Sequence, residues 1–140
     1  MRRYVVWLSI AVSVLFAVSG CSKPAENEVA LDTEFTLSVG QSASIAGEDL
    51  HIAFVEVVSD SRCPTGATCI WAGEASCLIE LTTPESTYPK VLTQPGSSSP
   101  PEASVADYEI VFDIQPYPEL GKDIQEKDYL LKLVVTRAPA

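Results

Sequence analysis

Residues Tyr108 to Gln115, with the sequence YEIVFDIQ, carry the clearest structural signal in this chain of 140 residues. Large apolar side chains occupy every second position, and Glu109, Asp113 and Gln115 lie between them. A period of two residues places alternate side chains on opposite faces of a β-strand. The stretch therefore predicts a strand with one face in a hydrophobic core and the other in water.

The same period recurs along most of the chain from Glu34 onward. The predicted inward rows are Phe35, Leu37 and Val39; Ala43 and Ile45; Leu50, Ile52 and Phe54; Ala75, Cys77, Ile79 and Leu81; and Tyr129, Leu131, Leu133 and Val135. The row that starts at Leu50 reaches Glu56 on the same face, which predicts a β-bulge there. Tyr88 to Thr93 is predicted as a short edge strand, weakened by Pro89.

The segments between these strands lack helical periodicity and are rich in turn-forming residues. Gln94 to Pro101 is predicted as the loosest loop, and Gln115 to Gly121 contains two prolines that cannot donate ladder hydrogen bonds. Parallel strands need long crossovers, so six or seven strands without a long helix predict antiparallel pairing. One-sided strands bury their apolar faces when two sheets stack or one sheet closes. We predict an all-β fold, an antiparallel β-sandwich of Ig-like type, with a small β-barrel as the alternative.

The first 20 residues have the layout of a secretory signal peptide. Arg2 and Arg3 form a basic start, and Tyr4 to Val18 is almost wholly apolar. This run is shorter than the roughly 20 residues of a spanning helix, and the layout is typical of an export signal. The sequence Val-Ser-Gly-Cys that ends at Cys21 resembles the lipobox of bacterial lipoproteins. The resemblance implies transfer of a diacylglyceryl group to the Cys21 sulfur and cleavage before this residue.

This resemblance predicts three parts of the chain. Residues 1–20 are the signal peptide, residues 21–33 are the lipidated cysteine and a flexible polar tether, and residues 34–140 form a single β-sandwich domain. Acyl chains contribute about 0.8 kcal/mol per buried methylene, so two or three of them hold a protein stably on a membrane. We therefore expect anchoring to the bacterial cell envelope through Cys21. Ser22 implies sorting to the outer membrane if the host is Gram-negative.

The charge of the mature chain excludes some partners. Loss of Arg2 and Arg3 leaves seven Lys and Arg against nineteen Asp and Glu, a net charge of −12. Nucleic-acid binding requires basic side chains that neutralise phosphates, so we expect no nucleic-acid partner. Basic proteins and cations would be attracted to such a domain, although the charge also serves solubility.

Asp60 to Ala75, with the sequence DSRCPTGATCIWAGEA, is the most distinctive stretch. Cys63 and Cys69 enclose a Pro-Thr-Gly turn, and disulfides persist in exported proteins, so we predict a bridge between them. Cys77 is left as a buried thiol, and a Cys69–Cys77 bridge stays open as an alternative. A zinc site that combines the three cysteines with His51 lacks the close cysteine pair usual for such sites. We therefore predict no metal and no cofactor.

The loop around this bridge contains the candidate binding residues Asp60, Arg62, Trp71 and Glu74. Asp60 and Arg62 either pair and cap the loop or form a recognition tip. Trp71 is expected to pack over the disulfide or to plug the end of the sandwich. The alternative is an exposed anchor for a partner, since tryptophan is enriched at binding hot spots.

The same stretch resembles a signature of small exported bacterial proteins and lipoproteins whose function is uncharacterised. The resemblance covers about residues 49–135 and includes a later segment like Tyr108 to Pro118. It implies a single β-domain and pairing of Cys63 with Cys69. It implies no particular activity.

The sequence contains few features of an enzyme, and we assign no catalytic residue. His51 is the only histidine, and its apolar neighbours place it on the outward face of its strand. Cys77 occupies an inward strand position in an acidic domain, the opposite of the electropositive, partly exposed setting that a nucleophilic cysteine requires. We predict a non-catalytic binding or accessory module, in one version an inhibitor that binds a basic protein such as a lysozyme. The alternatives are a structural envelope lipoprotein without a small-molecule site and a cation-binding module.

Overall fold

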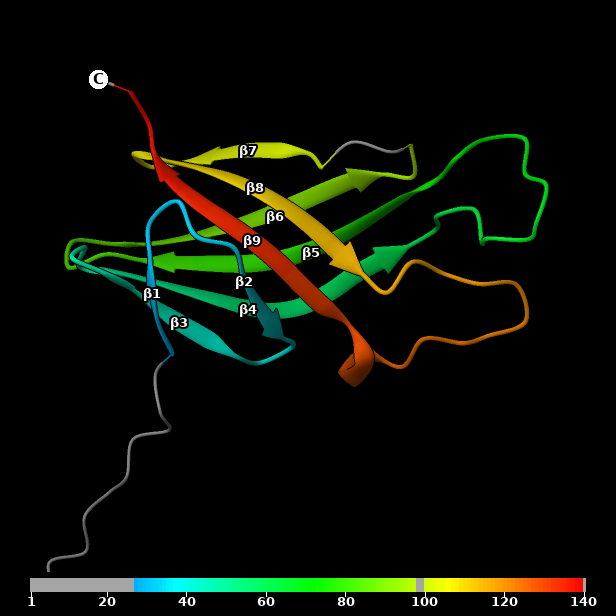
Figure 1. Ribbon diagram of the computed structural model, residues 1–140, viewed down its shortest axis with the longest axis horizontal. Coiled ribbons are helices and arrows are strands. Elements are labelled where there is room, and N and C mark those ends of the chain that lie inside the picture. Colours follow the sequence, from blue (N-terminus) through cyan, green and yellow to red (C-terminus); the bar gives the residue numbers. More distant parts are fainter. Residues whose placement is uncertain (1–26, 98–99, 140) are drawn as a thin grey trace, which may run out of the picture.

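The computed structural model describes residues 27–97 and 100–139, and the domain is a sandwich of two β-sheets (Figure 1). The predicted signal peptide, Cys21 and the first part of the predicted tether lie outside the described residues. The described part of the chain contains no helix with the length and hydrophobicity needed to cross a membrane.

The first sheet has five strands and the second has four. In spatial order the first consists of β1 (Asn27–Ala30), β3 (Ser42–Ala46), β4 (Leu50–Asp60), β5 (Glu74–Thr82) and β6 (Thr87–Pro95). The second consists of β2 (Phe35–Ser38), β9 (Leu130–Arg137), β8 (Tyr108–Gln115) and β7 (Glu102–Val105). All neighbouring strands are antiparallel except β1, which pairs in parallel with β3. The prediction of an antiparallel sandwich is confirmed, and the barrel alternative is wrong because the two sheets do not close.

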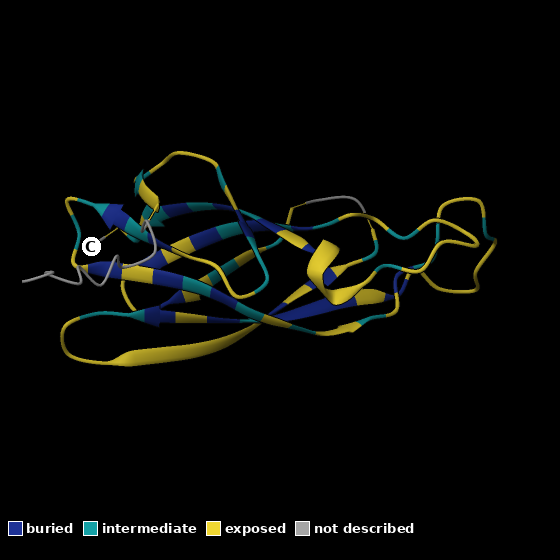
Figure 2. Cartoon of the chain, turned by 90° about the horizontal axis from the view of Figure 1, so that it is seen from below, coloured by how far each residue is buried: buried dark blue, intermediate teal, exposed yellow. Residues whose placement is uncertain are grey.

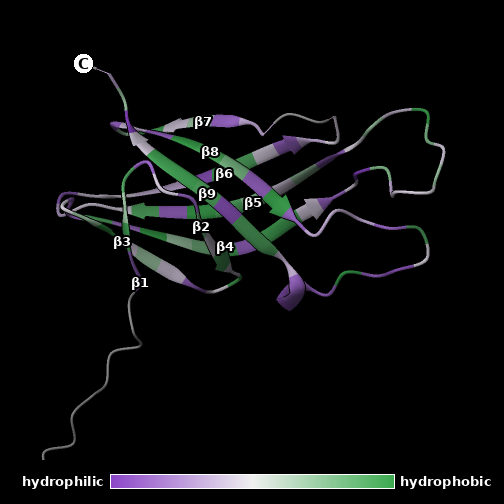
Figure 3. Cartoon of the chain, in the orientation of Figure 1, coloured by the Kyte–Doolittle hydropathy of each residue, from purple (hydrophilic) through white to green (hydrophobic). Residues whose placement is uncertain are grey.

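The core lies between the sheets and is built from the predicted inward rows (Figure 2). Every residue of the rows in β3, β5 and β8 is buried, as are Leu50, Ile52 and Phe54 of β4. Figure 3 shows the corresponding alternation of hydrophobic and hydrophilic residues along the strands. Phe35 and Val39 are only partly buried and pack against the core from its margin. Alternation therefore identified the core correctly, since each strand has one face in contact with the opposite sheet.

The bulge predicted at Glu56 is confirmed. The register of β4 against β5 shifts between Phe54 and Glu56, and again between Val57 and Ser59. The first shift turns Glu56 to the exposed outer face. The second shift leaves Asp60 opposite the buried Ala75, and residues directly opposite each other share a face. Asp60 therefore points toward the inside at the end of the sandwich.

Three segments differ from the prediction. Asn27–Ala30, expected within the flexible tether, form β1, where only Val29 packs against the core and the hydrophobic signal is correspondingly weak. β7 was not predicted, and β6 is longer than the expected edge strand at both ends. A single 3-10 turn, η1, spans Glu126–Asp128 before β9.

Two long loops leave the sandwich at the same end (Figure 1). The disulfide loop, residues 61–73, joins β4 to β5 of the first sheet. The proline loop, residues 116–125, leads from β8 of the second sheet to η1. Most residues of both loops are exposed (Figure 2). We call the two loops together the projection.

Candidate functional site

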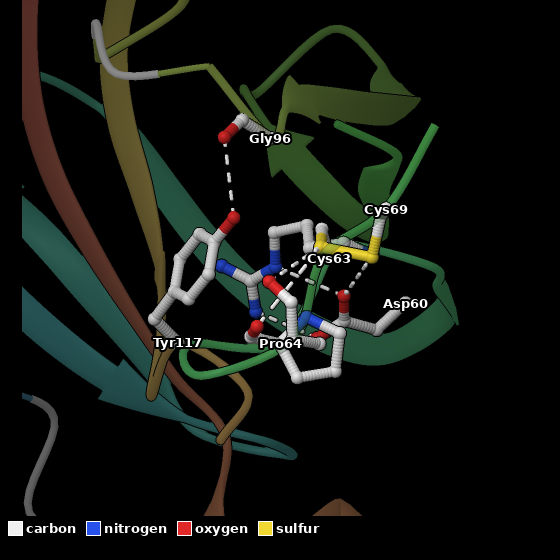
Figure 4. Close-up of a disulfide and its surroundings, with 8 residues drawn as sticks. Asp60, Cys63, Pro64, Cys69, Gly96 and Tyr117 are labelled. Atoms are coloured by element: carbon white, nitrogen blue, oxygen red, sulfur yellow. Dashed lines mark hydrogen bonds and ion pairs between the residues drawn. A yellow bond between two sulfur atoms is a disulfide. The ribbon is translucent and has the colours of Figure 1, made fainter. Parts of the chain in front are cut away.

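A disulfide joins Cys63 to Cys69 within the disulfide loop, as predicted (Figure 4). The sulfurs are 2.09 Å apart and the Cα atoms 6.0 Å. Cys77 is a buried free thiol, so the alternative bridge to Cys77 is wrong. Burial raises the pKa of the Cys77 thiol to about 12, which keeps it protonated at neutral pH. The disulfide also occupies two of the four side chains that a zinc site with His51 would need.

Arg62 joins the base of the disulfide loop to the second sheet. Its side chain is fully buried, with Nη1 donating to the Ile114 carbonyl oxygen at 2.6 Å and Nη2 to that of Pro116 at 3.0 Å. Nε and Nη2 also donate to the two carboxylate oxygens of Asp60 at 2.9 and 2.6 Å. The guanidinium thus uses its planar array of donors for a bidentate ion pair and two carbonyl groups.

Asp60 completes this buried cluster. It accepts hydrogen bonds from the Arg62 backbone N–H at 3.2 Å and from the Tyr129 hydroxyl at 3.1 Å. Burial alone would raise the pKa of Asp60, but the hydrogen bonds and charge of Arg62 lower it below its ordinary value. Burial and the nearby Asp60 charge raise the pKa of Tyr129 to about 12. Asp60 and Arg62 therefore pair and hold the loop at its base, with the Arg62 side chain fully buried and that of Asp60 8% exposed.

Tyr117 of the proline loop covers the buried guanidinium. Arg62 Cζ lies 4.9 Å from the centroid of the Tyr117 ring, within the range of a cation–π contact. The Tyr117 hydroxyl donates to the carbonyl oxygen of Gly96 at 3.2 Å (Figure 4). This one side chain therefore connects the proline loop to both the disulfide loop and the segment after β6.

Gln94 makes a second connection between the sheets at the same end. Its Nε2 donates to Asp113 Oδ1 at 2.7 Å, and its Oε1 accepts from the Ile114 N–H at 2.5 Å. Sequence reasoning had placed Gln94 in the loosest loop, whereas it lies in β6 and is buried. The sequence signal that could have placed it is the period of two, because Gln94 follows the apolar Leu92 by two residues and therefore shares its inward face.

Glycines allow the backbones to pack closely at the base of the disulfide loop. A Cβ added to Gly73, whose φ is +71°, would lie 1.9 Å from the Ser61 carbonyl oxygen, and one added to Gly96 would lie 2.1 Å from that of Ala72. The Gly96 N–H donates to the Gly73 carbonyl oxygen at 2.8 Å. Glycine is required here because no side chain fits between the three backbones.

The two loops of the projection are bonded to each other beyond this base. The Thr65 N–H donates to the Pro118 carbonyl oxygen at 2.9 Å, and the Leu120 N–H donates to that of Thr65 at 3.0 Å. Thr65 and Glu119 form an isolated parallel bridge. A Cβ at Gly66 would lie 3.7 Å from Leu120 Cβ, so the two loops are in van der Waals range. Loops from different sheets therefore act as one structural unit.

The outer part of the disulfide loop is apolar and exposed. Ile70 is fully exposed and the Trp71 side chain is 63% exposed, so the expectation that Trp71 packs over the disulfide or the sandwich end is wrong. Residues 63–73 contain no charged side chain. Figure 3 shows hydrophobic colour near the outer end of this loop. Glu74 is exposed at the start of β5, and its backbone is bonded to Ser61.

The proline loop adds further exposed apolar surface. Leu120 is 65% exposed and Tyr117 is 40% exposed. Of its three charged residues, Glu119 and Lys122 form an ion pair of 2.5 Å at the surface, and Asp123 is exposed. Half of the large hydrophobic side chains that are exposed over the described residues therefore belong to the projection; the others are Val58, Tyr88, Val91 and Leu130.

Other chemistry would depend on metal-ligating side chains, on His51 or on surface hollows among the described residues. Over residues 27–97 and 100–139, no three His, Cys, Asp or Glu side chains are grouped so that they could hold a metal ion. His51 is exposed, as expected, with Nδ1 3.0 Å from the Ser44 hydroxyl. One hollow of about 160 Å³ beside the proline loop is lined in part by Tyr117 and Ile124, and a more open hollow of about 380 Å³ lies against Val39 and η1.

The projection is therefore a rigid, two-loop structure with an apolar outer surface on an acidic domain. Exposed apolar surface of this kind suits contact with another macromolecule. No protein-family model, no curated protein and no solved structure significantly matches this chain.

Proposed function

We propose that this protein is a non-catalytic binding module, held at the bacterial cell envelope by lipid on Cys21, that contacts a basic protein partner through the disulfide loop. The observation that carries the proposal is the exposure of Ile70 and Trp71 on a loop whose base is buried and hydrogen-bonded. The specific version is an inhibitor of a basic hydrolase such as a lysozyme.

The rigidity of the loop supports a binding role. An interface gains most from large side chains that enter a partner's pocket and lose little conformational freedom on binding. The disulfide and the Arg62 hydrogen bonds restrict the loop before any partner arrives. Trp71 has two rotatable side-chain bonds, so its own ordering cost is also small.

The charge of the domain supports a basic partner. The mature chain, with Arg2 and Arg3 removed, carries a net charge of −12, yet residues 63–73 carry none. Long-range attraction would accelerate association with a basic protein, while the uncharged apolar loop would provide the short-range contact.

The buried thiol supports a binding module over an enzyme. Cys77 is the one free cysteine among the described residues, and burial holds its pKa at about 12. A nucleophilic cysteine requires an accessible thiolate, so Cys77 does not meet this requirement.

The lipid anchor is tested on the full chain produced in a bacterium that is fed a labelled fatty acid. We expect label in the mature protein, which fractionates with membranes, and no label in Cys21→Ala. A full-length, unlabelled protein in the cytosol would contradict the anchoring part of the proposal.

The contact is tested by calorimetric titration of the detergent-solubilised full chain with a basic lysozyme at low and moderate salt. We expect binding that weakens with salt and falls at least about fivefold for Trp71→Ala, a loss of about 1 kcal/mol that only a minority of interface residues reach. Val91→Ala is the matched control, because Val91 is 50% exposed on β6 outside the projection. Absence of binding and of inhibition at low salt would exclude the lysozyme version.

A further inference from the structure

We propose that the proline loop completes the binding surface. Leu120 and Tyr117 of this loop and Ile70 and Trp71 of the disulfide loop then enter a single apolar site, rimmed by basic residues, on a partner protein. This inference rests on the proposed function and adds to it a second set of contact residues and the shape of the partner's site. The sequence had marked the segment only as a loop with two prolines.

The two loops present their apolar residues as one unit. The hydrogen bonds between Thr65 and the backbone of Pro118 and Leu120 join the outer parts of the loops. Arg62 joins their bases through the Pro116 carbonyl oxygen and the Tyr117 ring. Leu120 therefore lies on an element whose position relative to the disulfide loop is already set.

The charges around the projection favour a protein site with a basic rim. Glu119 and Lys122 form an ion pair, so the exposed Asp123 is the remaining charge of the proline loop and the outer surface of the projection carries little net charge. The rest of the domain carries the excess of carboxylates. An apolar centre surrounded by acidic surface is complementary to an apolar pocket surrounded by basic side chains.

The position of the projection disfavours insertion into the anchoring membrane. Asn27 pairs with Ala43, which pairs with Ile52. From Ile52 to Asp60 the strand β4, with its two bulges, runs alongside Leu81 to Ala75 of β5, which is about 20 Å at roughly 3.3 Å per residue, and the projection extends farther. The chain that leads to Cys21 thus joins the sandwich well away from the two loops (Figure 1). An acidic domain is also repelled by anionic lipid.

The test places a photo-reactive amino acid at position 71, 120 or 91 of the full chain in its source bacterium, followed by identification of the adducts. We expect positions 71 and 120 to cross-link to the same basic protein and position 91 not to cross-link to it. For that purified protein, Leu120→Ala and Trp71→Ala should each weaken binding at least about fivefold, and Val91→Ala less than twofold. Circular dichroism checks that the variants stay folded.

The other outcomes separate this inference from the proposed function. A partner captured from position 71 but not from 120, with unchanged affinity for Leu120→Ala, would overturn the inference and leave the proposed function standing. Lipid adducts from positions 71 and 120 would overturn the inference and the proposed function in favour of membrane insertion. Absence of any adduct from either position would also overturn both.

Discussion

The base and the tip of the disulfide loop differ in what holds them. The base, around Arg62 and Gly73, is fixed by buried hydrogen bonds and close backbone packing. The tip, residues 66–71, is held by the disulfide and by a turn in which the Ala67 N–H donates to the Pro64 carbonyl oxygen at 3.0 Å. Stability therefore resides at the base, while the apolar side chains of the tip contribute little to the fold and are available to a partner.

Replacement of Arg62 should produce the largest effect. Arg62→Met leaves the Asp60 carboxylate without its cationic partner and the carbonyl groups of Ile114 and Pro116 without the guanidinium donors, so we expect a loss of about 3–5 kcal/mol in the free energy of unfolding. Urea denaturation measures this loss. Lys122→Met, which removes an exposed ion pair, should cost at most about 1 kcal/mol. Equal losses in the two variants would show that the base is not the stabilising region.

Gly73→Ala tests backbone packing at the base. Gly73 and Gly121 both have positive φ values, +71° and +79°, so alanine at either position costs about 1–2 kcal/mol in backbone conformation. Only at Gly73 does the added Cβ meet another backbone, at Ser61. We expect Gly73→Ala to be the more destabilising by at least about 2 kcal/mol in urea denaturation. A matching loss in Gly121→Ala would contradict the close packing.

Removal of the disulfide should have a smaller effect, centred on the tip. The chain-entropy model gives about 2 kcal/mol for a loop closed by residues six apart in sequence. We expect the double variant Cys63→Ser, Cys69→Ser to lose about this amount of stability and to keep the fold. Hydrogen exchange should accelerate at residues 66–71 and stay slow at the Gly96 N–H, which is bonded at the base. Faster exchange at both places would show that the disulfide holds the whole loop.

The smallest effect concerns acid pH. The pKa of Asp60 is lowered in the folded protein, so its contribution to stability is fully present above its ordinary value of 3.8 and is lost as pH falls through the folded pKa. The difference in unfolding free energy between the native chain and Asp60→Asn should therefore be constant from pH 7 to 5 and narrow below about pH 4. A difference that stays constant down to pH 2 would contradict the lowered pKa.

Sequence reasoning succeeded where a feature depends on neighbours in the chain. The bulge at Glu56 followed from a charged residue on an apolar row, and the Cys63–Cys69 bridge from a short turn between two cysteines. It failed for β1, because a short edge strand that buries one side chain, Val29, produces almost no periodic signal. It also misplaced Gln94, whose partners lie on β8 of the opposite sheet.

The amino-acid sequence by itself determined the sandwich, because a period of two apolar residues leaves each sheet with one face to bury. Tertiary structure alone decided the roles within the distinctive loop. Arg62 is buried because carbonyl groups 52 and 54 residues away accept its hydrogen bonds, and no local sequence pattern contains these partners. Trp71 is exposed although it is large and apolar, because hydrogen bonds of Arg62, Tyr117 and Gly96 hold the base of the loop and leave its outer part outside the core.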